Sequence, residues 1–600
     1  MFSPFVVPFC IGVISLLVVS IVKYCRWISR FDKKQRSIIR HGILSWKIIP
    51  ALWETFRESL LHWRITKHNI LLGYMHRSLA FGWFLLIVVG ALQALLAYPT
   101  GHPFWVAIFF NYFEPRTTPV HLVPYTSIIA ATMDILLLYV FSGLSLAILK
   151  KCWSRPMGMK TTTHHNITDH IAKAALWCIF PLRLLAESAT SAIYHNGSIL
   201  VSRTGQLLAT AGFASPAIEY NCWTLYSLSL GTFFVLMPFT RYMHIFTEVL
   251  LIYFRTLGVT ESTRLSGYTL FGLSACSRCG ICIDGCPIHR HLGISDTQGV
   301  YLLQHIRNKD LWDKASHIAD TCMACGRCSE VCPVQEDLAA IRQQTRVTAL
   351  ATIDRPQGYQ YLQATHPFNA VGRIAYFGGC MSHLTPATTQ AMETIFTATG
   401  QRYCYLDQEK TICCGRPLQQ QGLIKQAEEL RRRNQELIKH SHATMLVTSC
   451  PICYRSFTQE YNLNIPVMHH TQYLAMLIQQ GRIKVSHNDL RISYHDPCEL
   501  GRGCGIYDQP RQVIQSLATL LHTKEEAKDS LCCGHNLGNT VLDTHQQALI
   551  RNAALHNLME PHPDIIATAC PACKKSFMRA SNIPVKDIAE LVAERLEKIN

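Results

Sequence analysis

The sequence TICCG at residues 411–415 is matched by LCCG at residues 531–534. Two adjacent cysteines place their side chains on opposite sides of the local backbone, so such a pair rarely serves one ordinary tetrahedral metal site. The flanking cysteines repeat as well, at offsets of 118, 119 and 120 residues. One set of five is Cys380, Cys413, Cys414, Cys450 and Cys453, and the other is Cys498, Cys532, Cys533, Cys570 and Cys573. The carboxyl-terminal part of the chain is therefore a duplicated unit.

Apolar, strand-like runs lead into four of these cysteines. The runs are RIAYFGGC (373–380), ATMLVTSC (443–450), LRISYHDPC (490–498) and DIIATAC (564–570), and polar helices such as IKQAEELRRRNQELIKH (424–440) lie between them. This alternation predicts two small α/β lobes, at residues 371–480 and 488–600, with cysteines at the carboxyl ends of strands, where open sheets bind their ligands. Gly415 and Gly534 would let the backbone turn closely around bulky inorganic sulfide.

A different cysteine pattern precedes the duplicated unit. CSRCGICIDGCP (276–287) and CMACGRCSEVCP (322–333) share the spacing C-x₂-C-x₂-C-x₃-C-P, which is typical of two-cluster [4Fe–4S] ferredoxins. We predict an α-helical ferredoxin domain at residues 256–350 whose two cubane clusters conduct electrons. The fourth cysteine of each run ligates the other cluster. The expected ligand sets are Cys276, Cys279, Cys282 and Cys332 for one cluster, and Cys322, Cys325, Cys328 and Cys286 for the other. Zinc sites also use CxxC pairs, but a zinc site does not require eight thiolates with this spacing.

The first 255 residues contain long apolar runs. Five of them are long enough to cross a hydrocarbon core of about 30 Å as helices, near residues 4–24, 74–98, 126–149, 172–194 and 219–243. The loops 25–73 and 150–171 are rich in Lys and Arg, whereas 99–125 and 195–218 carry only Arg116 and Arg203. The positive-inside rule then predicts a cell (inner) membrane protein with its amino terminus outside and its carboxyl-terminal domains in the cytoplasm. A signal peptide at residues 1–24 is a weaker interpretation, because the basic residues follow the apolar run.

Charge and cysteine usage exclude two other classes of protein. The net charge of +16 could indicate a nucleic-acid partner, but Lys23 to Arg77 alone carries 12 basic residues against three acidic ones, between two apolar segments. A positive cytoplasmic loop explains this charge, so we expect no nucleic acid. Twenty of the 25 cysteines follow residue 255 in tight clusters that the topology places in the cytosol, which favours metal ligation over disulfides.

Two histidines lie at matched depth in the apolar part of the chain. His76 begins the second apolar run and His244 follows the fifth. One imidazole on each face of the iron is the ligation of a b-type haem, so we predict that this pair holds one haem b. The alternative is a pair of interfacial histidines that bond to water or lipid headgroups.

Residues 74–255 resemble the haem b, quinone-reactive gamma subunit family of respiratory nitrate reductase. The resemblance lies in the histidine that leads the second run, MDILLLYVFSGLSLAILKKCWSRP (133–156), RLLAES (183–188) with Arg183 and Glu187, and the histidine that closes the fifth run. It implies haem b and a quinone as the diffusible partner. That family often uses four histidines for two haems, but Tyr226 stands about where a further histidine would fall, so one haem is expected.

Residues 371–580 resemble the cysteine-rich domains of the heterodisulfide reductase catalytic subunit, which also occur in the iron–sulfur subunits of anaerobic glycerol-3-phosphate and glycolate oxidases. The resemblance implies that each complete five-cysteine set holds a noncubane [4Fe–4S] cluster and that the two clusters face each other across a substrate disulfide. The sequence CCGHNLG (532–538), with His535 and Asn536, departs from the more glycine-rich relatives. An alternative is a conventional cubane cluster with the extra cysteine as a bystander.

The expected fold is therefore multidomain: a five-helix transmembrane bundle, an α-helical two-cluster ferredoxin domain and two duplicated α/β cysteine-rich lobes. The expected function is a membrane-bound oxidoreductase that couples a quinone pool, through haem b and [4Fe–4S] clusters, to disulfide/thiol chemistry. An alternative is an electron conduit from electron-transfer flavoprotein or a flavin dehydrogenase to menaquinone. A redox sensor or assembly factor is a third. The absence of G-x-G-x-x-G and Walker patterns means that any flavin chemistry comes from a soluble partner.

Overall fold

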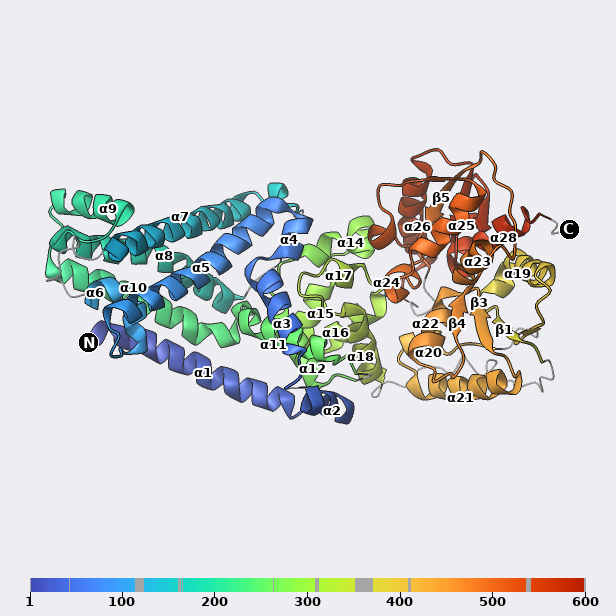
Figure 1. Cartoon of the computed structure of the whole chain (residues 1–600), viewed down its shortest axis with the longest axis horizontal. Helices are drawn as coiled ribbons and strands as arrows, with labels where there is room; N and C mark the ends of the chain where they lie inside the picture. Colours follow the sequence, from blue (N-terminus) through green and yellow to red (C-terminus); the bar gives the residue numbers. More distant parts are fainter. Residues whose placement is uncertain are drawn as a thin grey trace. The chain divides into compact units, whose positions relative to one another are not determined.

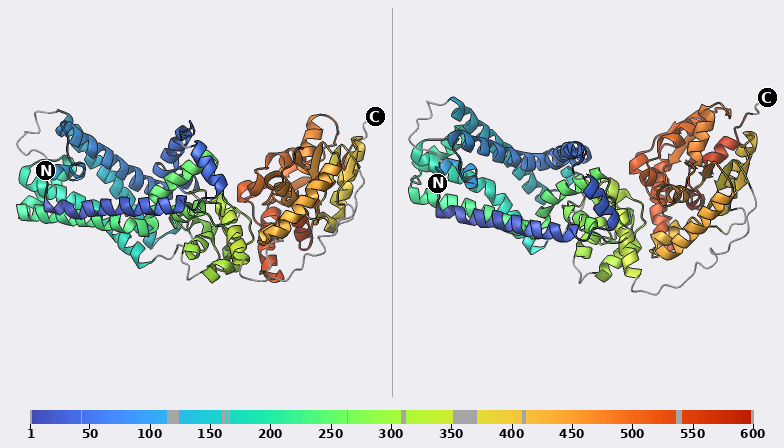
Figure 2. Two further views of the ribbon diagram at one scale, coloured as in Figure 1. Left: turned by 90° about the horizontal axis from the view of Figure 1, so that it is seen from below. Right: turned by 60° about the horizontal axis from the view of Figure 1, so that its bottom comes forward.

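The computed structural model describes residues 2–42, 44–113, 124–159, 163, 166–262, 264–307, 312–350, 371–407, 412–535 and 541–597 (Figures 1 and 2). Arg116, Thr411 and Asn536, which the sequence analysis singled out, lie outside these residues. The chain divides into two compact units, Met1–Ser262 with Ser266–Gly280, and Thr263–Leu265 with Ile281–Asn600. Each unit is described by itself.

The first unit is built on long apolar helices. Among the described residues, five helical segments are long and apolar enough to cross a membrane: Pro4–Ile28, Ile70–Ala97, Ile128–Cys152, Ile167–Tyr194 and Pro216–Phe239. They correspond to α1 (Val7–Ile28), α5 (Ile70–Ala97), α7 (Pro124–Cys152), α8 (Ile167–Tyr194) and α10 (Pro216–Leu236). The sequence-based prediction of five such helices is confirmed, with boundaries shifted by a few residues.

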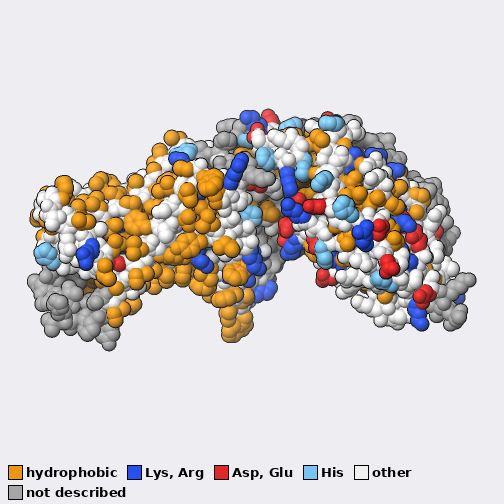
Figure 3. All heavy atoms as spheres, turned by 90° about the horizontal axis from the view of Figure 1, so that it is seen from above, with side chains coloured by type: hydrophobic (Ala, Val, Ile, Leu, Met, Phe, Trp, Pro, Cys, Tyr) orange, Lys and Arg blue, Asp and Glu red, His pale blue; other side chains and the backbone are white. Residues whose placement is uncertain are grey.

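Packing within this unit pairs helices that are distant in sequence. α10 packs against both α1 and α8, and α5 packs against α7. Phe5, Phe109 and Trp223 form part of the aromatic core between them. Many side chains that face outward are also apolar, such as Ile14 and Leu17 of α1, and Figure 3 shows such side chains over much of the face of this unit. Apolar surface on this scale indicates association with a membrane.

Shorter helices surround the end of the bundle that carries His76. They are α2 (Lys33–Gly42), α3 (Ile48–Thr55), α4 (Trp63–His68), α11 (His244–Leu257) and α12 (Gly267–Ala275). At the other end of the bundle lie α6 (Phe110–Phe113) and α9 (Ile199–Thr210). Because α12 packs against α1 and α11, the compact units divide the chain inside the predicted ferredoxin domain of residues 256–350.

The second unit begins with short helices that connect the cysteine runs. These are α13 (Ile281–Asp284), α14 (Pro287–Leu292), α15 (Gly299–Arg307), α16 (Trp312–Thr321), α17 (Arg327–Glu330) and α18 (Leu338–Leu350). Proline at the first position of α14 follows a cysteine directly, and Pro is well tolerated there because that N–H has no partner within a helix.

Two parallel four-stranded sheets follow within the described residues. The first lobe contains β1 (Ile374–Phe377), α19 (Pro386–Ala398), β2 (Tyr403–Tyr405), α20 (Arg416–Gln420), α21 (Ile424–His440), β3 (Met445–Thr448), α22 (Pro451–Gln459), β4 (Val467–His469) and α23 (His470–Gln479). The second contains β5 (Arg491–His495), α24 (Gly501–Cys504), α25 (Asp508–Leu517), β6 (Thr519–Leu521), α26 (Thr544–Met559), β7 (Ile565–Thr568), α27 (Pro571–Met578), β8 (Val585–Asp587) and α28 (Ile588–Ala593).

The two lobes are related by an approximate two-fold arrangement. Their strand orders, β2-β1-β3-β4 and β6-β5-β7-β8, are equivalent. α19 of the first lobe packs on α28 of the second, and α23 packs on α25, so the same kinds of helix meet in both directions. One apolar core, which includes Ile374 and Ile492, runs through both lobes. The predicted order of apolar helices, helical segment and two α/β lobes is confirmed at this level.

Candidate functional site

The cysteines of the duplicated unit lie at equivalent positions of the two sheets. Cys380 and Cys498 follow the ends of β1 and β5 after two-residue links, and Cys450 and Cys570 follow β3 and β7. Cys450 and Cys570 are the N-cap residues of α22 and α27. A helix N-terminus favours a thiolate, so these CxxC pairs are well placed to bind a metal.

In the first lobe the paired cysteines are buried and in contact with the other thiols. Hydrogen bonds from the thiols of Cys413 and Cys453 lower the pKa of Cys414 to about 6. The Tyr461 hydroxyl donates to the Cys414 carbonyl oxygen (3.0 Å), and the Asn434 side-chain amide donates to that of Cys413 (2.8 Å). These contacts fix the backbone of the cysteine pair.

The second lobe repeats the arrangement. The sulfur atoms of Cys573 and Cys533 lie 3.3 Å apart, and the Ser576 hydroxyl donates to the Cys533 carbonyl oxygen (2.6 Å). Hydrogen bonds from Cys532 and Cys573 lower the pKa of Cys533 well below its usual value. Gly534 has φ of +74° and its counterpart Gly415 has φ of +84°, which explains glycine after each cysteine pair.

The cysteine sets of the two lobes are neighbours. Cys380 of the first lobe packs with Cys413, and it also contacts a buried cluster that contains Met381 and the second-lobe residues Cys533, Cys570 and Cys573. A group of five buried or half-buried thiols in each lobe is more than one tetrahedral zinc ion uses, and it fits an iron–sulfur group. That these cysteines are ligands remains a prediction.

One ferredoxin-type set also comes together. Cys286 lies beside Cys322 and Cys325, and burial raises its pKa to about 11. Burial raises the pKa of Cys328 to about 12 in the same surroundings, while the nearby Arg342 guanidinium opposes the shift. These are the four cysteines that the spacing assigns to one cluster. Free thiols this deeply buried are costly to ionise, and iron supplies the positive charge that stabilises them.

The cysteines of the other ferredoxin-type set are divided between the units. Cys276 and Cys279 belong to the first unit and Cys282 and Cys332 to the second, so their common cluster remains a prediction. The turn between the first two is anchored within the first unit, because Arg278 pairs with the buried Asp169 of α8 at 2.6 Å. The Arg278 carbonyl oxygen accepts a hydrogen bond from Thr163 (2.8 Å).

The complete ferredoxin-type set packs against the second lobe. Cys325 shares a buried cluster with Cys532, and Cys286 and Cys498 pack on it. Arg502 donates to the Cys325 carbonyl oxygen (2.8 Å). One ferredoxin-type cysteine set and the cysteine set of the second lobe are therefore in direct contact.

The two candidate haem histidines have the same hydrogen-bonding pattern. Nδ1 of His76 contacts the Leu72 carbonyl oxygen at 2.9 Å, and Nδ1 of His244 contacts the Arg241 carbonyl oxygen at 2.6 Å. Such a bond places the proton on Nδ1 and the lone pair on Nε2, which is how a metal-ligating histidine is oriented. The pair therefore fits a haem, and its ligation remains a prediction. The ring of His62 lies 5.5 Å from that of His76 and was not anticipated.

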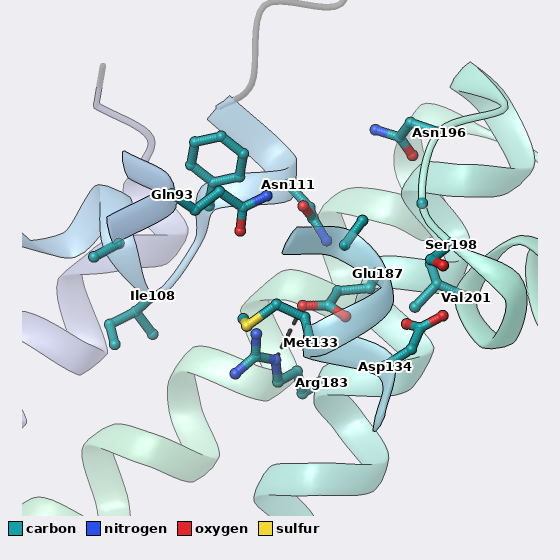
Figure 4. Close-up of a pocket in the computed structure, with 14 residues that line it drawn as sticks. Gln93, Ile108, Asn111, Met133, Asp134, Arg183, Glu187, Asn196, Ser198 and Val201 are labelled. Carbon is teal, nitrogen blue, oxygen red and sulfur yellow. Dashed lines mark hydrogen bonds and ion pairs between the residues drawn. The ribbon is translucent and has the colours of Figure 1, made fainter. Parts of the chain in front are cut away.

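A polar pocket lies toward the other end of the bundle (Figure 4). It encloses about 120 Å³ between α5, α7, α8 and the start of α9. In Figure 4 the Arg183 guanidinium and the Glu187 carboxylate are joined by an ion pair of 3.0 Å, with Asp134 nearby. Residues lining the pocket include Gln93, Asn111, Met133, Asn196 and Ser198. Buried ionisable groups inside an apolar bundle are costly and usually functional.

Comparison with known families agrees with the cysteine geometry. Residues 374–458 and 492–578 match the family model described as cysteine-rich domain, and residues 272–335 match the 4Fe-4S dicluster domain. Residues 272–578 thus combine a 4Fe-4S dicluster domain with two cysteine-rich domains, and in this they are similar to iron–sulfur oxidoreductases of the heterodisulfide reductase type. A subunit of the dihydromethanophenazine:CoB--CoM heterodisulfide reductase of Methanosarcina barkeri is 30% identical over 241 residues, 37% of this chain and 59% of the relative.

Two further relatives resemble the chain over shorter spans. EtfAB:quinone oxidoreductase of Syntrophomonas wolfei is 29% identical over 227 residues, 35% of this chain and 32% of the relative. A probable membrane-anchored ferredoxin of Chromohalobacter salexigens is 29% identical over 188 residues, 28% of each chain. The chain spans about three fifths of the length of the heterodisulfide reductase relatives that it matches.

Three contributions to the site escaped the sequence analysis. His62 lies in the basic segment between the first two apolar runs, and helix boundaries at His62 and Asn69 separate it from His76, so no single helical period connects the two histidines. Asp169 pairs with a residue more than 100 positions away, which no local pattern reveals. His495 lies beside the second-lobe cysteines, and the strand motif YHDPC could have indicated it, because its counterpart in the first lobe is YFGGC.

Proposed function

We propose that the chain couples a quinone pool to disulfide/thiol chemistry in the manner of a heterodisulfide reductase. The observation that carries the proposal is the pair of complete five-cysteine sets in equivalent positions of adjoining lobes, with Cys380 packed against the buried cluster that contains Cys533, Cys570 and Cys573 of the other lobe. A one-electron conductor has no need of two neighbouring five-thiol sites. A two-electron cleavage of an S–S bond does, because each site can receive one sulfur.

The overall reaction is balanced by the two partners alone. Quinol and a disulfide R–S–S–R′ give quinone and the two thiols RSH and R′SH, so that two electrons and two protons leave the quinol and enter the disulfide. The iron–sulfur clusters and haem b, when bound, supply one-electron transfer between these two-electron partners. Within the chain, the ten cysteines of the two lobes would hold noncubane clusters, and His76 and His244 would hold one haem.

The polar pocket of Figure 4 is our candidate for the quinone headgroup. Its volume of about 120 Å³ is comparable to the cavity of about 150 Å³ that holds a benzene ring in an engineered protein. Arg183 can donate to a quinone oxygen, and the carboxylates of Glu187 and Asp134 can accept the protons that leave a quinol. The pocket lies near the end of α5 opposite to His76, so protons and electrons would depart toward opposite ends of the bundle.

We further propose that the amino terminus lies outside the inner membrane and that the cysteine-rich lobes lie in the cytoplasm. The distribution of Lys and Arg between the loops supports this orientation. Labelling of Cys152, which is exposed at the end of α7, tests the orientation: in right-side-out vesicles an impermeant thiol reagent should reach it only after the vesicles are opened.

Iron analysis and paramagnetic resonance of the anaerobically purified chain test the main proposal. Four clusters require about 16 non-haem iron atoms, whereas the two cubes alone require about eight. Titration with a thiol or disulfide should perturb the signal of an oxidised lobe cluster. The disulfide chemistry would be contradicted by a chain that contains only the two cubane clusters. It would also be contradicted if no thiol changed the paramagnetic signals of the lobe clusters.

The haem assignment is tested separately. His244→Ala should abolish the absorption band of reduced haem while it leaves the iron–sulfur signals intact. His62→Ala is the matched control, because His62 is a histidine next to His76 that the assignment does not use. A wild-type chain with no haem, or a haem that disappears with His62 and survives loss of His244, would refute the assignment.

A second candidate function is a conduit between a flavoprotein and quinone. It is favoured by the similarity to a relative whose name is EtfAB:quinone oxidoreductase. In that case thiols would not change the paramagnetic signals of the lobe clusters. Quinone reduction would start only when an electron-transfer flavoprotein is added.

A further inference from the structure

The two lobes carry different rings at one equivalent position. β1 ends at Phe377 and β5 ends at His495. Phe377 pairs in register with Thr448, and His495 pairs with Thr568. In the first lobe the terminal ring packs edge-on against Phe457 at 5.0 Å and 83°.

The corresponding ring pair of the second lobe has nearly the same geometry. His495 packs against Phe577 at 4.8 Å and 80°. The lobes therefore keep one ring-on-ring contact and replace a benzene ring with an imidazole. Since the packing is the same in both, the exchange changes the polarity and hydrogen bonding at this position rather than its shape.

The His495 imidazole is buried beside cysteine sulfurs. His495 is 4% exposed, and a ring nitrogen lies within 4.8 Å of the sulfur atoms of both Cys533 and Cys573. Buried polar groups are almost always hydrogen-bonded, and these sulfurs are the acceptors at hand.

The first lobe has no such donor at this position. Phe377 lies in a buried apolar cluster with Cys414, Cys450 and Cys453, and its ring cannot donate a hydrogen bond to them. The sulfurs of the two cysteine sets therefore differ in their hydrogen bonding although their backbones are equivalent.

We propose that the His495 imidazole donates a hydrogen bond to the ligating sulfur of Cys533 and so makes the cluster of the second lobe easier to reduce than that of the first. Reduction adds negative charge to the cluster and its sulfurs, and a donor stabilises that charge. Hydrogen bonds to the sulfurs are among the factors that set iron–sulfur potentials. The proposal rests on the proposed function in one respect, that both lobes hold clusters.

The contact between the second lobe and the ferredoxin-type cysteines determines which lobe cluster is reduced first. Cys532 of the second lobe packs with the ferredoxin-type Cys325. The lobe that lies next to the electron-conducting ferredoxin-type cysteines is therefore also the lobe that contains the hydrogen-bond donor His495. Electrons should therefore enter the second lobe first, one at a time, and the first lobe should receive its electron at a lower potential.

His495, Cys533 and Cys573 could also be taken for a three-ligand zinc site. Two of these residues belong to the five-thiol set, so zinc there would exclude an iron–sulfur cluster. Zinc in place of iron in the second lobe is therefore an outcome that overturns the proposal.

The test is a potential titration of the full-length chain, purified anaerobically and followed by paramagnetic resonance, after iron and zinc are counted. In His495→Phe, which copies the first lobe, reduction of the second-lobe cluster should become at least tenfold less favourable, about 59 mV for a one-electron couple. His495→Gln keeps a donor and should stay within threefold of wild type. Phe377→His should make reduction of the first-lobe cluster more favourable. His522→Ala, at a histidine that is 72% exposed in the second lobe, is the control and should change nothing.

The outcomes separate this proposal from the proposed function. Absence of lobe clusters from the wild-type chain refutes the proposed function and, with it, this inference. Assembled clusters whose potentials are unchanged in His495→Phe overturn the inference alone. If His495→Phe fails to assemble its cluster, Phe377→His decides: an unchanged first-lobe potential overturns the proposal, and a raised one supports it.

Discussion

The first and second cysteine-rich lobes share strand order, strand register and the positions of five cysteines, yet they differ in what surrounds those cysteines. In the first lobe the neighbours include the apolar ring of Phe377 and the polar side chains of Asn434 and Tyr461. In the second lobe they include the polar ring of His495 and the ferredoxin-type cysteines around Cys325. Duplication thus preserved the backbone that presents the thiols, while the side chains around them diverged.

This difference shows that equivalent backbones do not produce equivalent redox sites. The potential of a cluster depends on hydrogen bonds, charge and burial around its sulfurs, and these come from side chains and from neighbouring segments. The second lobe packs against Cys286 and Cys325, so the two lobes are expected to have different roles in one electron path. Substitutions at equivalent positions of the two lobes test how far the equivalence extends.

Loss of one thiolate in each lobe should have the largest effect. Cys414→Ser and Cys533→Ser each remove the thiol with the lowered pKa, so each should lose the lobe cluster and reduce disulfide turnover more than 100-fold. Turnover with a reduced dye, together with iron analysis, measures this. Both variants should keep the paramagnetic signals of the two ferredoxin-type clusters. Full turnover in either variant would mean that the lobes do not act as a pair.

Alanine at the two equivalent glycines should lower the free energy of unfolding by different amounts in the two lobes. A Cβ at Gly534 would lie 2.3 Å from the Gln547 carbonyl oxygen, whereas one at Gly415 would lie 3.0 Å from that of Ala427. Both residues have positive φ, which costs about 1–2 kcal/mol for a non-glycine residue. Gly534→Ala should therefore cost about 3 kcal/mol or more and Gly415→Ala about 1–2 kcal/mol. Thermal unfolding of the purified chain measures the two, and equal losses would contradict the difference in packing.

Weakening the contact between the ferredoxin-type segment and the second lobe should have an intermediate effect. Glu525 of that lobe pairs with Arg290 and Arg327 at 2.6 Å each. Glu525→Gln should slow reduction of the second-lobe cluster about tenfold, which corresponds to about 1.4 kcal/mol. Stopped-flow reduction measures the rate. Glu436→Gln, in an exposed pair of the first lobe, should leave it unchanged.

The same contact should weaken in acid. Burial opposes the ionisation of Glu525, but hydrogen bonds from Arg290 and Arg327 outweigh it and lower the pKa below its ordinary value of 4.5. A depressed carboxyl pKa contributes stability that is complete above the ordinary pKa and is lost as the pH falls through the lowered value. Wild type should therefore approach the rate of Glu525→Gln only at a pH below about 4.5. A loss that begins near neutral pH would point to another group.

The smallest difference should come from two equivalent serines. The Ser576 hydroxyl donates to the Cys533 carbonyl oxygen at 2.6 Å, whereas the Ser456 hydroxyl lies 3.4 Å from that of Cys414 and donates to the Glu460 carboxylate at 3.0 Å. A buried hydrogen bond contributes about 1 kcal/mol, so Ser576→Ala and Ser456→Ala should each cost about that much, although the two serines lose bonds to different partners. Thermal unfolding of both variants provides the measurement, and a clear difference between the two losses would contradict this expectation.

Sequence periodicity and cysteine spacing determined the architecture. Five apolar helices, a helical cysteine-rich segment and two α/β lobes were all predicted, because apolar runs of membrane length and strand–cysteine repeats are local signals. The spacing also grouped Cys286 with Cys322, Cys325 and Cys328, which lie together in the structure. Such features follow from the chain itself, since helix and strand periods and short metal-binding loops depend on nearby residues.

Tertiary structure alone decided what surrounds these elements. The packing of Cys325 on the second lobe, the ion pair between Asp169 and Arg278, and the approach of His495 to Cys533 all join residues that are far apart in sequence. No local pattern encodes them, because each depends on how separately formed helices and sheets pack. The sequence thus identified the residues able to hold metal, and only the fold showed that the two cysteine-rich lobes place theirs in different electrostatic surroundings.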